Sequence, residues 1–155
     1  MNTVVATILA SKGHAVFTIK EHDTVFTALE QLAKHDVGAL LVTDEHQNIL
    51  GIFSERDYAR KVAEKGKISR NSLINKLMNP HVQVIRSANT LLDCLNIMTK
   101  KHVRHLPVVD EGKLLGVVSI GDIVYKIINE QKTTIDSLEH YISGSDYGSY
   151  IEAKP

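Results

Sequence analysis

An internal repeat is the feature that most limits how this chain can fold. Residues 51–57, Gly-Ile-Phe-Ser-Glu-Arg-Asp, return as residues 116–122, Gly-Val-Val-Ser-Ile-Gly-Asp, with glycine, serine and aspartate at the same spacing. Upstream of these stretches Thr24 aligns with Thr90 at an offset of 66 residues, and the match spans most of residues 4–128. Self-similarity over such a length is typical of a duplicated structural unit. We therefore expect two copies of one fold.

Each copy predicts the element order β-α-β-β-α. Residues rich in β-formers lie at 16–19, 39–42 and 49–53 in the first copy, and at 82–85, 106–109 and 114–118 in the second. A helix follows the first run of each copy, with Asp23 or Asn89 as a candidate N-cap. A second helix starts near Glu55 or Gly121. The first helix repeats its apolar residues at i, i+3, i+4 and i+7, the pattern of one buried face, at Val25, Ala28, Leu29 and Leu32.

The boundaries follow from this alignment. We expect a first repeat over residues 4–66 and a second over 71–130, with a short helix ending before Pro80 because the residue before proline disfavours the helical region. A further helix, capped by Thr133 or Thr134 and running through Ile142, and a mobile tail fill residues 131–155. The fold class is α/β (α+β). Neither copy is long enough to bury its sheet alone, so the two should pack sheet to sheet.

Charge and cysteine content narrow the classes of partner. Lys plus Arg and Asp plus Glu both number 18, so the formal net charge is zero. Neither nucleic acid nor a membrane is an expected partner, since both call for a basic excess or an apolar span. The single cysteine, Cys94, cannot form an internal disulfide, which fits a reducing cytoplasm. On the helix face it occupies, we expect it to be a core residue.

The junction motif Ser-x-x-Asp has two interpretations. Before an apolar helical run it is a capping box, which stabilises the helix by about 1 kcal/mol and has no further function. The same geometry also suits a ribose phosphate. The helix N-terminus and the serine hydroxyl can donate hydrogen bonds to phosphate, and the aspartate can accept them from ribose hydroxyls.

The repeated junctions, together with His-Val-Arg-His-Leu-Pro-Val-Val-Asp at residues 102–110, resemble a tandem pair of CBS domains, also called a Bateman module. The resemblance covers about residues 4–130. It implies two pseudo-twofold-related repeats with two clefts between them, and a homodimer in which four repeats form a flat disc. Members of this family bind adenine nucleotides, most often AMP, with ATP, ADP, S-adenosylmethionine or NAD as variants.

The resemblance also implies which residues would line the two clefts. In the first cleft Asp57 would hold the ribose, while Ser54, the two arginines and the histidine would face phosphate. The second cleft is barer, because Gly121 stands in place of Arg56. The first cleft would be formed by Ser54, Arg56, Asp57, Val84, Ile85, Val103, Arg104 and His105. The second would be formed by Thr18, Ile19, Val37, Gly38, Ala39, Ser119 and Asp122.

Other chemistry finds little support in the sequence. His102 and His105 suggest a metal site, but side chains three apart on a strand point to opposite faces, and no acidic or cysteine cluster supplies further ligands. Residues 58–61 are either a solvated helix face or a contact near the nucleotide or the dimer. No nucleophile with a supporting base is evident, so we expect no enzyme and no catalytic cofactor.

These observations lead to a regulatory hypothesis with two alternatives. The chain would sense adenine nucleotides and signal energy state to an unidentified partner protein through a change of shape or association. Alternatively it is a nucleotide-independent structural adaptor for an enzyme or transporter, with both junctions serving only as caps. A small nucleotide hydrolase is a third hypothesis, with no metal-binding acids in its favour.

Overall fold

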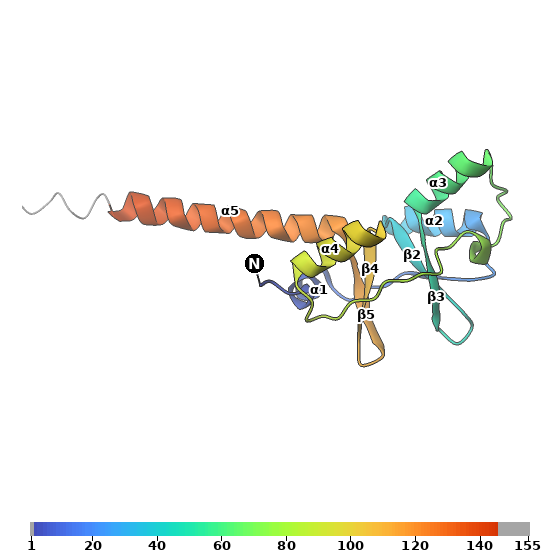
Figure 1. Ribbon diagram of the computed structural model, residues 1–155, viewed down its shortest axis with the longest axis horizontal. Helices are drawn as coiled ribbons and strands as arrows, with labels where there is room; N and C mark the ends of the chain where they lie inside the picture. Colours follow the sequence, from blue (N-terminus) through green and yellow to red (C-terminus); the bar gives the residue numbers. More distant parts are fainter. Residues whose placement is uncertain (1, 146–155) are drawn as a thin grey trace, which may run out of the picture.

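A computed structural model describes residues 2–145 as two small sheets with helices packed around them (Figure 1). The first repeat contains α1 (Val5–Lys12), β1 (Thr18–Lys20), α2 (Val25–His35), β2 (Ala39–Thr43), β3 (Ile49–Ser54) and α3 (Glu55–Lys65). The second contains the 3-10 turn η1 (Ile74–Lys76), α4 (Leu91–Lys101), β4 (His105–Asp110), β5 (Lys113–Ser119) and α5 (Ile120–Ser145). The mixed α/β architecture of two repeats confirms the predicted fold class.

Helices α2 and α4 begin one residue later than the sequence suggested. Their N-caps are Thr24 and Thr90, whose hydroxyls accept the backbone N–H three residues ahead, and Thr90 forms a full capping box with Asp93. The prediction of Asp23 and Asn89 as caps is wrong. Their side chains instead accept the backbone N–H three residues earlier, at 3.1 Å and 2.8 Å, and so close the turn that precedes each helix.

The two sheets differ at the strand that precedes the first helix. In the first repeat β1 runs parallel to β2, which is antiparallel to β3. In the second repeat β4 and β5 pair, but the predicted strand at 82–85 forms only a single bridge, Ile85 to Val108. Pro107 explains the difference. Its counterpart Leu41 donates its N–H to Phe17 O at 3.1 Å, and proline has no N–H to extend the ladder in this way.

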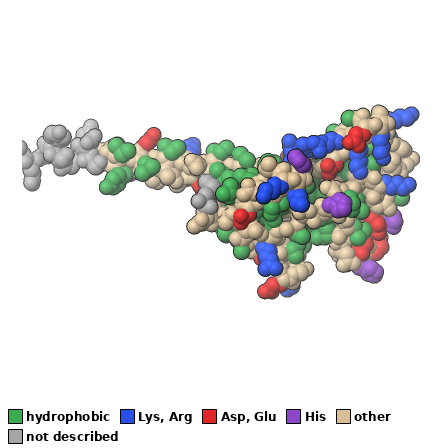
Figure 2. Space-filling model, viewed as in Figure 1, with side chains coloured by type: hydrophobic (Ala, Val, Ile, Leu, Met, Phe, Trp, Pro, Cys, Tyr) green, Lys and Arg blue, Asp and Glu red, His purple; other side chains and the backbone are tan. Residues whose placement is uncertain are grey.

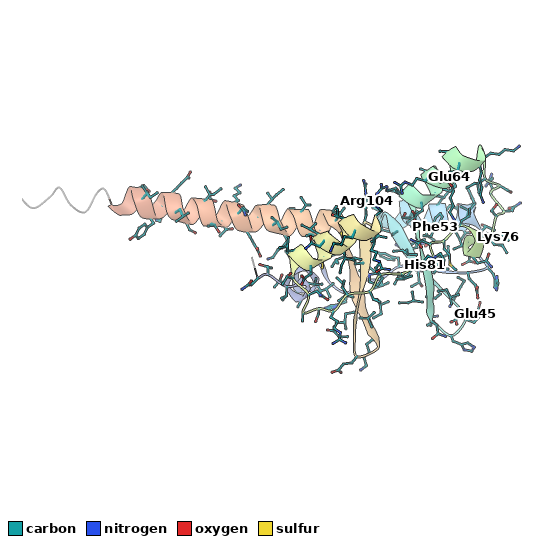
Figure 3. All side chains as sticks on the ribbon, viewed as in Figure 1. Glu45, Phe53, Glu64, Lys76, His81 and Arg104 are labelled. Atoms are coloured by element: carbon teal, nitrogen blue, oxygen red, sulfur yellow. The ribbon has the colours of Figure 1, made fainter. Side chains whose placement is uncertain are left out.

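The opening segment of each repeat packs on the other repeat. Helix α1 contributes Val5, Ile8 and Leu9 to the core of the second repeat, alongside Leu106, Val118 and other buried residues of that repeat. Conversely, Ile74 and Leu77 at η1 belong to the core of the first repeat, which also contains Phe53 (Figure 3). Each core is therefore completed by a segment from the opposite half of the chain.

Two glycines allow these exchanged segments to lie close to the sheets. A Cβ on Gly116 of β5 would stand 2.8 Å from Leu9 Cδ2. A Cβ on Gly51 of β3 would stand 2.6 Å from Met78 Sδ and 2.8 Å from the backbone oxygen of Asn79. The glycines of the two junction motifs are therefore equivalent contact points. Leu9 of α1 and Met78 after η1, which contact them, occupy equivalent positions in the two repeats.

Cys94 is a buried member of the second core, as predicted. Its side chain is fully buried, and burial, aided by the nearby charge of Asp93, raises the pKa of the thiol to about 11. The thiolate is the reactive form of cysteine, so this thiol is inert at neutral pH.

Helix α5 is continuous over 26 residues and extends beyond the globular part of the molecule (Figure 1). The prediction of a separate helix capped by Thr133 or Thr134 is wrong. Both hydroxyls donate to the carbonyl four residues back, at 2.9 Å each, which a threonine does inside a helix. The residues 146–155 of the predicted tail lie outside the described part. No helix within residues 2–145 is both long and apolar enough to cross a membrane.

Replacing Gly51 by alanine should destabilise the fold. The new methyl group would press on backbone at Asn79, which cannot move aside as a flexible side chain does, and overpacking of this kind costs about 1–3 kcal/mol. Gly116→Ala should cost less, because only the end of Leu9 has to shift. Urea denaturation followed by circular dichroism would measure both.

Gly121→Ala is the matched control for these variants. A Cβ there meets only Ser119 Oγ, at an ordinary 3.6 Å, and the residue lies in a helix where alanine is favoured. Its free energy of unfolding should be unchanged or higher. Equal losses in all three variants would contradict the assigned contacts.

Candidate functional site

Two cavities lie where the repeats meet. The first cleft, of about 260 Å³, contains Ser54, Arg56 and Asp57 at the start of α3 together with residues before and at the start of β4. The second cleft, of about 290 Å³, contains Ser119 and Asp122 together with residues before and in β2. Each cleft thus joins the junction motif of one repeat to the other repeat, as the predicted arrangement requires.

The two junctions use their aspartates differently. In both, the serine caps the helix, with the N–H of Asp57 or Asp122 donating to Ser54 or Ser119 Oγ at 3.1 Å. Only Asp122 completes the capping box, accepting the N–H of Ser119 at 2.8 Å. Within residues 2–145 the Asp57 carboxylate has no hydrogen bond or ion pair. It faces the first cleft with its acceptor capacity unused.

Arginine side chains from both repeats meet in the first cleft. Arg56 comes from α3, and Arg104 precedes β4, between the two repeats in Figure 3. The pKa of Arg56 is lowered chiefly by the charge of Arg104 and next by that of Arg60, so these guanidinium groups are close enough to repel. No carboxylate in the described residues forms an ion pair with either lining arginine. A cluster of this kind is suited to a multiply charged anion.

The second cleft already holds a cation of the protein itself. Lys12 Nζ, at the end of α1, lies 2.6 Å from Asp122 Oδ2 and donates to the carbonyl oxygen of Val117 at 2.9 Å. Burial would raise the pKa of Asp122, but the hydrogen bonds from Lys12 and Ser119 outweigh it and hold the pKa below its usual value. The Asp122 carboxylate is therefore engaged both by Lys12 and by the backbone N–H of Ser119. The exchanged position of α1 brings Lys12 here, which the sequence analysis missed.

In residues 2–145, no cation forms an ion pair with Asp57 as Lys12 does with Asp122. The contacts at the two glycines relate Leu9 to Met78, so the position equivalent to Lys12 is His81. His81 is exposed and is not among the residues that line the first cleft. The sequence did contain a signal for Lys12. Extending the alignment of residues 4–9 with residues 73–78 by three positions pairs Lys12 with His81 and shows that the two repeats differ there.

His105 forms a wall shared by both clefts. Its imidazole lies over Gly38, and a Cβ there would stand 3.3 Å from ring atoms Cε1 and Nε2. Burial, followed by the charge of Lys12, lowers the pKa of His105, although Asp122 and Asp57 act in the opposite direction. The ring is therefore neutral at pH 7, next to carboxylates of both junctions.

Not all of the predicted residues line the clefts. Val103, Arg104 and His105 line the first, and Val37, Gly38 and Ala39 line the second, but the remaining four predicted residues line neither. Their role as ligand contacts stays a prediction that the cavity geometry does not support. These four are Thr18, Ile19, Val84 and Ile85.

The register of the parallel pairs explains this displacement. Thr18 pairs with Leu41, so the residue level with Gly38 lies three positions earlier, and the cleft is lined by residues 15–17. Ile85 is bridged to Val108 in the same way, well beyond the start of β4, and Asn79 lines the first cleft instead. Ile19 and Ile85 are core residues with 5% and 4% exposure.

The predicted absence of a metal site at His102 and His105 can be compared with the structure of residues 2–145. No group of three or more His, Cys, Asp or Glu side chains in that range could hold a metal ion. His102 ends α4 in a left-handed conformation, with φ 54°, while His105 begins β4, so the two residues belong to different elements.

Comparison with known proteins identifies the repeats. The CBS domain family matches residues 9–64 and 74–129. A CBS domain-containing protein of Arabidopsis thaliana, CBSX3, mitochondrial, is 31% identical over 92% of this chain and 73% of its own length. A putative signal-transduction protein with CBS domains from Burkholderia ambifaria superposes with a TM-score of 0.78 at 39% identity, over 83% of this chain and 96% of its own. The structure of CBSX2 in complex with AMP superposes with a TM-score of 0.63 at 25% identity, over 83% and 98%.

Removing the Lys12 charge should raise the pKa of Asp122. In Lys12→Met the carboxylate loses its nearest cation, and burial then favours the protonated form. The chemical shift of the Asp122 carboxyl carbon, followed by NMR as the pH is lowered, would measure the change. Because the folded pKa is depressed in the wild type, Asp122 contributes stability above its unfolded pKa. This contribution is lost as the pH falls through the folded pKa, and it should be smaller in the variant.

Lys65→Met serves as the control, since Lys65 is exposed at the end of α3 and lines neither cleft. An Asp122 pKa that moves equally in both variants would show that net charge, not the contact with Lys12, sets it.

Proposed function

Because the chain belongs to the CBS-domain family and carries two CBS domains in tandem, we propose that its first cleft binds an adenine nucleotide, AMP before ATP, ADP or NAD, in a regulatory role. One observation carries the proposal. The chain has two Ser-x-x-Asp junctions, and in the described part only the carboxylate of Asp57 makes no hydrogen bond or ion pair. It lies in a cavity that also holds two arginines without ion pairs. A capping role alone would account for Asp122 but not for Asp57.

The free groups match the parts of a nucleoside phosphate. Asp57 accepts hydrogen bonds from the two ribose hydroxyls, for which a carboxylate has enough lone pairs. Arg56 and Arg104 bind phosphate oxygens from opposite sides, and the N-terminus of α3 adds its partial positive charge. His105 lies beside the same site and can donate one further hydrogen bond. The similarity of this chain to CBSX2, whose structure is a complex with AMP, supports this choice of ligand.

The second cleft is the weaker site in this proposal. A ribose there would have to displace Lys12 from Asp122 or share the carboxylate with it, and that contact is only 2.6 Å long. At the positions equivalent to Arg104 and Arg56, the second cleft has Gly38 and Gly121. A first nucleotide therefore fills the first cleft.

Signalling follows if the ligand prefers one arrangement of the two repeats. The first cleft is formed by both halves, so a ligand that contacts Asp57 and Arg104 together stabilises the arrangement in which they face each other. A partner protein that recognises this arrangement would respond to nucleotide. The homodimer, the regulated partner and the cytoplasmic location remain parts of the proposal.

Isothermal titration of the full chain with AMP, ADP, ATP, NAD and S-adenosylmethionine tests the proposal. Arg104→Ala should weaken binding about tenfold or more, since a hydrogen bond to a charged group contributes about 1.5–3 kcal/mol. Arg86→Ala is the matched control. It removes the same charge from an exposed residue that lines neither cleft, and affinity should be retained. Equal affinities of wild type and Arg104→Ala, or no binding of any of these ligands, would overturn the proposal.

Nucleotide binding should also raise the pKa of His105. A phosphate placed between Arg56 and Arg104 brings negative charge towards an imidazole whose pKa is now depressed by burial and by the charge of Lys12. Because a raised pKa favours the protonated ring, affinity should increase as the pH falls through that pKa. NMR titration of the histidine ring protons, with and without AMP, measures the shift, and an unchanged His105 would place the phosphate elsewhere.

A further inference from the structure

The outer part of α5 extends beyond both the fold and the family match. The CBS domain match ends at residue 129, whereas α5 continues to Ser145 and is about 39 Å long. Near its start Ile123 is fully buried and Ile127 packs on the second core, and Thr3 donates to the carboxylate of Glu130 at 2.9 Å. Among the side chains described beyond that point, up to Ser143, the hydrogen bonds of Ser137 and Ser143 stay within the helix.

One face of α5 carries an apolar stripe with heptad spacing. Its members alternate in steps of four and three residues, the a and d positions of a coiled coil. The isoleucines stand at a, and valine, glutamine and leucine stand at d. The apolar members are exposed by 43%, 58%, 53% and 56% in chain order, and hydrophobic side chains are visible along the projecting helix in Figure 2. The stripe comprises Val124, Ile128, Gln131, Ile135 and Leu138, and its spacing continues at Ile142.

We infer that this stripe pairs with the same stripe of a second copy of the chain, as a parallel two-stranded coiled coil. Isoleucine at a with leucine at d favours two parallel strands. Gln131 indicates the direction. In parallel register it faces the Gln131 of the second copy, where two amides can hydrogen-bond to each other, whereas an antiparallel pair would set it against an apolar a position. The pairing is separate from any disc formed by the repeats, because most of the stripe lies beyond residue 129.

The chemistry of the helix favours a second copy over a membrane surface. The exposed aliphatic residues of the stripe keep to a and d and form a narrow seam, flanked by the exposed Tyr125 and Tyr141. A membrane-surface helix instead has a broad apolar face opposite a face rich in lysine and arginine. From Glu130 to Ser143 the polar positions hold one lysine and no arginine, against Glu130, Asp136 and Glu139. An unsupported helix of this length is also marginal in water, so pairing supplies the stabilisation that the fold does not.

Disulfide trapping of the full-length protein tests the inference. Leu138→Cys places a thiol at d, facing the same residue of the second copy in a parallel pair, and oxidised glutathione should convert it to a covalent dimer on a non-reducing gel. Ser137→Cys is the matched control, one residue away on the outer face, and should stay monomeric on the gel. Cys94 is fully buried and should not react in either variant.

Cross-linking of Leu138→Cys alone supports the parallel pair. Equal cross-linking of both variants, or of neither, overturns it, as does sedimentation of the wild-type chain with phosphatidylcholine–phosphatidylserine vesicles. Helix content gives a second measurement. Ile135→Asp with Leu138→Asp should reduce the circular dichroism signal at 222 nm, and Thr133→Asp, on the opposite face, should leave it unchanged. Neither readout depends on nucleotide binding in the first cleft.

Discussion

The exchange of opening segments between the two repeats is the constraint on which this structure depends. Helix α1 completes the second core and η1 completes the first. A side chain on Gly116 would collide with α1, and one on Gly51 would collide with the residues that follow η1. Gly51 and Gly116 therefore belong to the same structural motif as the serine and aspartate that follow them three and six residues later. The glycine fixes how the opposite segment crosses the strand, and the serine and aspartate begin the helix at the end of that strand. The clefts lie between these two features.

The exchange also makes the two clefts unequal. Because α1 ends beside the second junction, Lys12 reaches Asp122, and the carboxylate is neutralised by the protein. The 3-10 turn η1 is shorter than α1, and the chain after it leaves the first junction without a cation of this kind. Duplication supplied two equal motifs. The two exchanged segments differ in length, and the lining positions hold arginine in one cleft and glycine in the other. These differences leave the Asp57 carboxylate without a hydrogen bond among the described residues, whereas the Asp122 carboxylate is bound by Lys12.

The fold could be predicted from the sequence because the internal repeat and the spacing of apolar residues indicate the helices and strands. The match to the CBS domain family confirms the resemblance that the motifs suggested. The junction residues could be placed because a strand end and a helix start leave little freedom at Ser54 and Asp57. Thr18 and Ile19 do not line the second cleft, for a physical reason. The register of a parallel pair is set by hydrogen bonds between distant segments, and the pattern of either strand alone does not reveal it. Lys12 was missed because its position depends on a contact between opposite halves of the chain. The length of α5 was underestimated, since threonines that bond back to the helix look the same in a sequence as threonines that cap one.

The exchanged segments have a consequence for how the molecule can be divided. A cut in the connection between α3 and η1 would leave the N-terminal fragment with an α1 that has no core to cover, and the C-terminal fragment with a second core open on one side. Neither fragment would carry a closed fold, yet each would hold the piece that the other lacks. Such halves are suited to reconstitution, in which two separately expressed fragments regain structure only when mixed. Unfolding of one repeat would remove a segment from the core of the other repeat, so the two repeats should unfold as one cooperative unit.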